Sequence, residues 1–150
     1  MKSKIKRLLE KFFLINDTPE KIAGGFALGV FLGIIPGGVA SALVLASFFR
    51  LNRLAAISGV MATNMWSTIA VLPLAAFVGS AIFGRGYAEL VLDYKNCLGF
   101  GWEYFFGRVV FFDVTLPLLL GFFVVALVIA AAAYGIMYGI LKRNKIRMKK

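Results

Sequence analysis

The residues that interrupt the long apolar stretches are those in this chain best suited to chemistry. The turn Pro36-Gly37-Gly38 breaks one apolar stretch, and Asn64, Ser67 and Thr68 break the next. In a bilayer core, irregular backbone survives only where protein or water satisfies its amides and carbonyls. A helix that restarts after each break presents free N–H groups and a partial positive end, which suit an anion. The two breaks therefore predict a substrate-binding site for an anionic group at mid-membrane depth.

Basic side chains stand close to these breaks in the sequence. Arg50, Asn52 and Arg53 follow the second apolar run, which extends from Val39 to Phe49. They complete the predicted binding site by supplying positive charge at its cytoplasmic rim. The opposing interpretation treats residues 36–38 as a surface loop and Asn64 as a hydrogen-bonding group between helices.

Residues suited to catalysis are scarce in this sequence. It contains no histidine and one cysteine, Cys97, and all seven carboxylates lie outside the apolar runs. Histidine is the commonest general base and metal ligand, and buried acids usually drive proton or cation transport. We therefore expect no enzyme, no metal site and no cofactor, and we disfavour carboxylate-driven transport.

The placement of the basic residues indicates a membrane protein. Lysine and arginine outnumber aspartate and glutamate by 17 to 7, and 61% of the 150 residues are hydrophobic. Six basic residues precede Ile22 and six follow Leu141, so the charge flanks the apolar runs. The positive-inside rule and anionic headgroups select this pattern. We predict a single membrane domain over residues 1–150, with both termini cytoplasmic, anionic lipid headgroups as partners and no nucleic-acid binding.

The N-terminal segment, residues 1–17, has the pattern of a basic amphipathic helix. Residues 2–15 carry apolar side chains at helical spacing, with lysine and arginine on the other face. The segment is too short and too charged to span a bilayer, which favours a helix lying in the membrane interface. A solvated basic helix packed on the protein is the alternative. A new helix starts after it, with Asp17 or Thr18 as the cap and Pro19 in the first turn.

Residues 18–84 are predicted to form a broken-helix core. Its first helix runs from about Ile22 to Ile35 and its second from Val39 to Phe49. Both are shorter than the roughly 20 residues that cross a hydrocarbon core. One long kinked helix fits this pattern, and so does a re-entrant hairpin that enters and leaves on the same side. We favour the hairpin because it returns Arg50 and Arg53 to the basic side of the membrane.

The next apolar stretch, residues 54–83, is too long for a simple perpendicular span. The polar cluster around Asn64 interrupts it, and Pro73 offers a second interruption. We predict another half-helix followed by a full crossing.

The C-terminal part of the chain predicts the second crossing. Residues 85–113 are predicted to form an external linker at headgroup level, because the charges of residues 85–108 balance and aromatic side chains are scattered among them. Residues 114–141 form the clearest transmembrane helix, and residues 142–150 form a basic tail. The expected fold class is an all-α membrane protein with an amphipathic N-terminal helix, a broken or re-entrant helix hairpin and two transmembrane crossings.

Three glycines of the first apolar run are spaced for helix packing. Gly25, Gly29 and Gly33 recur at intervals of four, and Gly37 continues the series. On a helix they form one smooth ridge that another backbone can approach closely. Packing within or between subunits is favoured over a ligand-lining role. Because so few membrane elements form only a small bundle, we also expect a homo-oligomer.

The order of motifs from Thr18 to about Ser80 resembles an uncharacterised bacterial membrane family, domain of unknown function 2062. The matching stretches are Pro19 to Ala23, Gly25 to Phe31, Gly33 to Pro36, Arg50 to Asn52, Gly59 and Asn64. In that family the last asparagine is usually followed by proline and a nearby threonine, whereas Met65 and Ser67 stand here. The resemblance implies the bacterial cytoplasmic (inner) membrane and, for some members, association with envelope glycosyltransferases. It implies no established reaction.

Two functional hypotheses follow from the sequence. The first is a small membrane protein that transports or binds an anionic solute or lipid headgroup at the mid-membrane helix breaks. The alternative is a non-transporting scaffold that docks a cell-envelope enzyme of the glycosyltransferase type through its basic helix and its glycine ridge.

Overall fold

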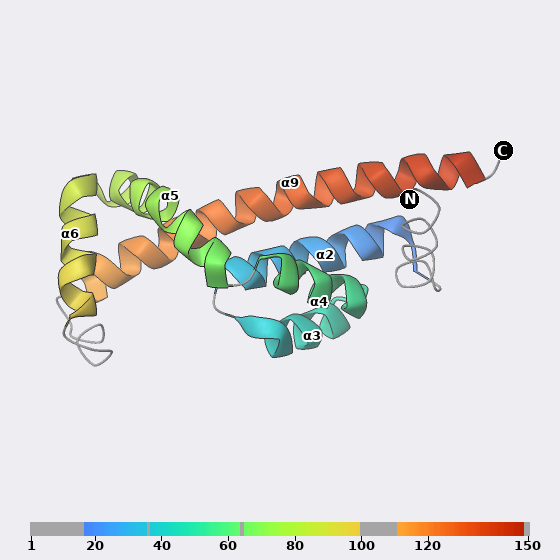
Figure 1. The fold of residues 1–150 in the computed structure, drawn as a ribbon, viewed down its shortest axis with the longest axis horizontal. Coiled ribbons are helices and arrows are strands. Elements are labelled where there is room, and N and C mark those ends of the chain that lie inside the picture. The colour runs from blue at the N-terminus through green and yellow to red at the C-terminus, as the bar shows by residue number, and fades with distance from the viewer. Residues whose placement is uncertain (1–16, 36, 64, 100–110, 149–150) are drawn as a thin grey trace. The chain divides into compact units, whose positions relative to one another are not determined.

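The computed structural model describes residues 17–35, 37–63, 65–99 and 111–148, and the regular structure in these ranges is helical throughout (Figure 1). The elements are α2 (Pro19–Ile34), α3 (Gly38–Phe48), α4 (Arg53–Ala62), α5 (Met65–Phe83), α6 (Tyr87–Leu98), a π-helical turn η1 (Phe111–Thr115) and α9 (Leu116–Met148). Two compact units divide the chain: unit 1 holds residues 1–68 and 128–150, and unit 2 holds residues 69–127. The all-α prediction is confirmed for the described residues. The predicted amphipathic helix over residues 2–15 lies outside them.

Helix α2 begins and ends where local sequence signals place its ends. Thr18 is extended and its hydroxyl accepts a hydrogen bond from the Lys21 N–H at 3.5 Å, while Pro19 occupies the first turn. At the other end Ile35 has φ −81° and ψ 135°, the extended conformation that a following proline imposes. The predicted first helix is therefore confirmed.

The chain reverses direction between α2 and α3. The Gly37 N–H donates to the Leu32 carbonyl at 3.3 Å near the end of α2. Leu51, which follows α3, packs against Gly24 near the start of α2. Since opposite ends of the two helices meet in this way, α2 and α3 form an antiparallel hairpin and not one long kinked helix. Its depth in a membrane stays a prediction.

Helices α2 and α4 run parallel and touch backbone to backbone. The contacts pair residues in the same order along both helices: Gly25 with Asn52, Gly29 with Ala56 and Gly33 with Thr63. A Cβ added to Gly29 would lie 2.9 Å from both the Ala56 carbonyl carbon and the Val60 nitrogen, which is closer than packed atoms allow. The glycine ridge of α2 thus faces α4 of the same chain.

Alanine and small aliphatic side chains fill the space among the three helices. The buried cluster consists of Leu32, Ala42, Ala46, Ala56 and Val60, with one or two members from each helix. Small residues suit this position because glycine contacts already bring α2 and α4 together, which leaves little room for side chains. Figure 1 shows α3 lying along α4 in this bundle.

The predicted break in the next apolar stretch is present. Helix α4 ends at Ala62 and α5 begins at Met65. The Thr63 hydroxyl donates to the Gly59 carbonyl at 2.8 Å and lies 3.2 Å from the Val30 carbonyl of α2. The second predicted interruption is absent, because Pro73 lies inside α5, which continues to Phe83.

In unit 2 a second pair of glycines brings α5 against the first turns of α9. Gly79 lies against the Pro117 carbonyl, and Gly121 lies against the Ala75 carbonyl. The order is reversed between the two helices, so this pair is antiparallel. The Ser80 side chain is buried nearby and donates to the Phe77 carbonyl of its own helix at 2.8 Å.

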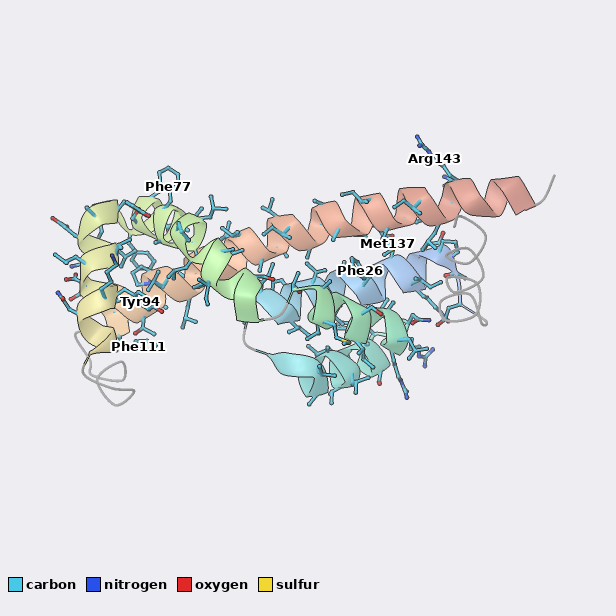
Figure 2. All side chains as sticks on the ribbon, viewed as in Figure 1. Phe26, Phe77, Tyr94, Phe111, Met137 and Arg143 are labelled. Carbon is cyan, nitrogen blue, oxygen red and sulfur yellow. The ribbon has the colours of Figure 1, made fainter. Side chains whose placement is uncertain are left out.

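The segment predicted as an external linker contains helix α6. The axes of residues 69–83 and 87–96 differ by 118°. Gly84, with φ 65°, ends α5, and the Arg85 N–H donates to the Ser80 carbonyl at 2.9 Å. Leu90 of α6 is fully buried among Ala76, Val114 and Leu118, and Tyr94 packs beside this cluster (Figure 2).

The Arg85 side chain connects the parts of unit 2. Its Nη1 donates to the Asp113 carbonyl at 2.6 Å. Its guanidinium also lies 3.9 Å from a carboxylate oxygen of Asp93 and of Asp113. Asp113 therefore lies in the π-helical turn before α9 and binds Arg85 through both its carbonyl and its carboxylate.

The described residues contain one helix that is long and apolar enough to cross a bilayer. It spans Phe111–Arg143, and 33% of its most apolar window is buried. The bent pair of residues 69–83 and 87–96 would be a second span if counted as one. Figure 2 shows Phe77 of α5 projecting outward. By length and composition these helices point to membrane association, and two crossings stay a prediction.

A methyl group added to Gly29 tests the contact between α2 and α4. Gly29→Ala should lower the thermal midpoint of the purified protein in detergent, because overpacking of a close contact costs about 1–3 kcal/mol. Gly135→Ala is the matched control in α9, since its Cβ would have no neighbouring atom within 4 Å. This control should leave the midpoint unchanged or raise it. Equal midpoints for the two variants would contradict the contact.

Candidate functional site

The residues predicted to bind substrate fall into two groups at opposite ends of the α2–α4 bundle. Arg50, Asn52 and Arg53 lie in the turn between α3 and α4, which we call the basic end. Gly37 and Gly38 precede α3, and Ser67 and Thr68 lie in the first turn of α5; we call this the break end. Helix α3 has 11 residues, so about 16 Å separates the two ends. Pro36 and Asn64 lie outside the described residues.

The break end brings the two interruptions together. Gly33 at the end of α2 lies against Thr63, which follows α4. Two helices therefore end here and two others begin. Helix ends expose carbonyl groups and helix starts expose N–H groups. A site with both kinds of group suits a ligand that has acceptors and donors, such as a phosphate ester with hydroxyl groups, better than a simple anion.

The backbone around Gly38 leaves space beside the start of α3. Gly38 has φ 69°, which glycine adopts without strain, and a Cβ built on it would have no atom within 4 Å. The Ser41 hydroxyl donates to the Gly37 carbonyl and lies 3.0 Å from the Gly38 carbonyl. The carbonyls of this turn are therefore engaged, while its open side is accessible.

At the basic end, Asn52 is buried and fixes the start of α4. Its Oδ1 accepts from the Ala55 N–H at 2.8 Å, as an N-cap does. Its Nδ2 donates to a carboxylate oxygen of Asp17 at 2.8 Å. Its backbone N–H donates to the Lys21 carbonyl at 3.1 Å. These bonds join the starts of α2 and α4, so a ligand would have to displace one of them to reach the Asn52 amide.

Asp17 supplies a negative charge where two helices start side by side. Besides accepting from Asn52, its carboxylate lies 3.8 Å from the Lys21 ammonium. Because both side chains of that ion pair are partly exposed, the pair contributes no more than about 1 kcal/mol. The Asp17 carboxylate therefore acts as an internal anion for the partial positive ends of α2 and α4.

Arg50 and Arg53 are exposed, and within the described part of the chain neither has an ion-pair partner. Arg50 has φ 54°, and the Leu51 N–H beyond it donates to the Ala46 carbonyl at 2.8 Å. This is a helix C-terminal motif that usually carries glycine at the left-handed position. The exposed Phe48 ring lies edge-on to the Phe49 ring, with 5.2 Å between the ring centroids.

Several of these features were absent from the predicted site. The bond between Asp17 and Asn52 joins residues 35 positions apart, so spacing does not reveal it. Asn52 directly before an apolar helix is a recognisable capping signal, which predicts its structural role. The left-handed Arg50 has no such signal, because the sequence pattern for this turn is glycine.

Exchanging the partners of the buried pair tests the structural role of Asn52. Asn52→Ala should lower stability by about 1–2 kcal/mol because it removes the N-cap. Asn52→Asp should also destabilise, since it sets two carboxylates against each other. Adding Asp17→Asn to Asn52→Asp restores an amide–carboxylate pair and should recover most of the loss in thermal midpoint. If the double variant melts no higher than Asn52→Asp, the pairing is wrong.

The comparisons with known proteins agree with the resemblance noted in the sequence. A family model described as an uncharacterised protein conserved in bacteria, DUF2062, matches residues 2–150. No curated protein and no solved structure gives a match. Since the family model covers almost the whole chain, this protein belongs to the DUF2062 family.

Proposed function

We propose that this protein is a multi-pass protein of the bacterial cytoplasmic membrane that binds, and moves, an anionic solute or lipid headgroup. Both termini are cytoplasmic, the α2–α3 hairpin is re-entrant, and two helices cross. The ligand is held at the break end and attracted by Arg50 and Arg53 at the basic end. The observation that carries the proposal is the meeting of two helix breaks at one end of unit 1.

The lengths of the helices support a mid-membrane position for the break end. Helices α3 and α4 contain 11 and 10 residues, which correspond to about 16 and 15 Å. The hydrocarbon core is about 30 Å thick. If the basic end lies at the cytoplasmic headgroups, the break end therefore lies near the bilayer centre.

The polar side chains of α3 and α4 are compatible with such a location. Ser47 and Ser58 donate to the carbonyls four residues before them, at 2.6 and 2.9 Å. Such bonds satisfy a hydroxyl without an outside partner. Among the residues that the structure describes, no buried side-chain nitrogen or oxygen lacks a hydrogen bond. Both helices therefore meet the requirement that hydrocarbon places on polar groups.

The charges favour an anion over a cation. The basic end exposes two guanidinium groups, and the Asp17 carboxylate at this end is already bound by Asn52 and Lys21. The described residues at the break end carry no ionised side chain, so an anion held there can bind the N–H groups that start α3 and α5, beside the carbonyls that end α2 and α4, and meets no acidic side chain. Carboxylate- or phosphate-bearing ligands fit these conditions.

One observation also favours the scaffold as a second candidate function. Gly135 and Gly139 of α9 have no neighbouring atom within 4 Å of an added Cβ. Ile136 between them is 66% exposed. A small-residue face of this kind accepts a helix from another membrane protein, such as an envelope enzyme or a second copy of this chain.

Removal of the site charges tests the binding function. We expect Arg50→Ala with Arg53→Ala, and separately Asn64→Ala, to weaken binding of short-chain phosphatidylglycerol to the purified protein about tenfold, because each removes donors worth at least about 1.4 kcal/mol. Binding is measured by native mass spectrometry in detergent. Lys95→Ala removes an exposed positive charge from α6 in unit 2 and serves as the control. Unchanged binding in all site variants would overturn the proposed site.

Deletion of residues 2–15 separates transport from scaffolding. A transporter should keep its anion flux after reconstitution into liposomes, because the deleted residues are not part of the predicted ligand site. A scaffold should lose its enzyme partner in co-purification, and Gly135→Leu with Gly139→Leu should have the same effect. Loss of the partner by a protein that shows no flux would favour the scaffold.

A further inference from the structure

We infer that the turn between α3 and α4 is an interfacial anchor that binds the phosphate of an anionic phospholipid and sets the depth of the hairpin. The anchor consists of Phe48, Phe49, Arg50, Arg53 and Leu54. The inference rests on the proposed membrane location and names a second ligand site, at the opposite end of α3 from the helix breaks. Its ligand is a lipid of the bilayer and not the transported group.

Large apolar side chains and arginines are exposed together in the anchor. Phe48 is 78% exposed, Phe49 57% and Leu54 54%, and Arg50 and Arg53 are exposed beside them. In water this arrangement leaves three large apolar side chains uncovered. At a membrane surface acyl chains cover the apolar groups while the guanidinium groups reach the phosphates. The composition of the anchor therefore matches the boundary between headgroups and hydrocarbon.

The backbone of Arg50 supports a role for its side chain. Among the described helices, α3 and α5 end in the same hydrogen-bonded turn, with a left-handed residue before the closing N–H. The turn after α5 uses Gly84, with φ 65°, whereas the turn after α3 uses Arg50, with φ 54°. A residue with a Cβ is strained in this conformation and glycine is not. Arginine at this position lowers the stability of the turn, and an interaction of its side chain with a ligand can offset this cost.

The guanidinium groups of the anchor are available for a phosphate. The Asp17 carboxylate lies at this end of the bundle, where it already accepts from Asn52 and faces Lys21. Within the described ranges, Arg50 and Arg53 have no carboxylate partner. Arginine binds phosphate through paired N–H donors, a stronger interaction than a contact with a neutral group.

The outer face of α3 identifies the ligand as a phospholipid. Exposed apolar side chains continue from the anchor along one face of this helix, at Ala40, Val44 and Phe48, which recur every four residues. This stripe covers most of the helix length, about 16 Å for its 11 residues. An acyl chain can lie along the stripe while its phosphate meets the arginines. A free anion would leave the stripe uncovered.

Arg50→Gly separates the stability of the turn from lipid binding. The variant should melt at a higher temperature than the parent protein in a zwitterionic detergent, because glycine removes the backbone strain. It should also lose most of the rise in melting temperature that phosphatidylglycerol gives over phosphatidylcholine in nanodiscs, and its preference for phosphatidylglycerol should fall about tenfold. Phe48→Ala with Phe49→Ala should reduce the stabilisation by both lipids, because both carry acyl chains, and should leave the preference for phosphatidylglycerol.

The controls and the contrary outcomes are distinct. Lys95→Ala, which removes one exposed charge from α6 in unit 2, should retain the lipid preference. If Arg50→Gly lowers the melting temperature in detergent and retains the full phosphatidylglycerol effect, the anchor is wrong. If inorganic phosphate stabilises the parent protein as much as phosphatidylglycerol does, the site binds a free anion and the lipid assignment is wrong.

Failure of the proposed function would be recognised separately. Release of the full-length protein from membranes by alkaline carbonate would remove the membrane location on which both proposals rest. If the protein stays in the membrane, and Asn64→Ala weakens ligand binding while the anchor variants change nothing, only the anchor is overturned.

Discussion

The close backbone contact between α2 and α4 is the constraint on which unit 1 depends. Glycines remove the side chains that would hold the two helices apart, so Gly29 meets the backbone at Ala56 and Gly59 meets the backbone at Phe26. Helices that approach so closely gain dispersion energy along their whole contact. The short helix α3 then needs only Ala42 and Ala46 to fill the remaining space.

The parallel direction of α2 and α4 decides where polar groups gather. Both helices start at the basic end, where their N–H groups meet the Asp17 carboxylate and the Asn52 cap. Both stop at the break end, beside the starts of α3 and α5. One end therefore carries the ionised side chains, and the other offers backbone groups in a largely apolar setting. This division underlies the two separate ligand sites that we propose.

In unit 2, glycines again allow close contact between two helices, and an arginine side chain holds the turn that follows. Gly79 and Gly121 allow α5 to contact the start of α9, and the pair is antiparallel. The turn that follows α5 is held by Arg85, whose guanidinium reaches Asp93 of α6 and Asp113 before α9. Because these acids come from two other elements, one side chain fixes the sharp bend between α5 and α6.

Local signals in the sequence determined the helices, whereas the tertiary structure decided which of their ends meet. Thr18, Pro19 and the residue before Pro36 set the limits of α2, because caps and proline act within one helical turn. The polar cluster near Asn64 likewise located the second break. The direction of α2 against α4, the bond between Asp17 and Asn52, and the left-handed Arg50 depend on contacts between distant segments. For this reason the sequence pattern predicts one ligand site, whereas the structure divides its residues between the two ends of the bundle.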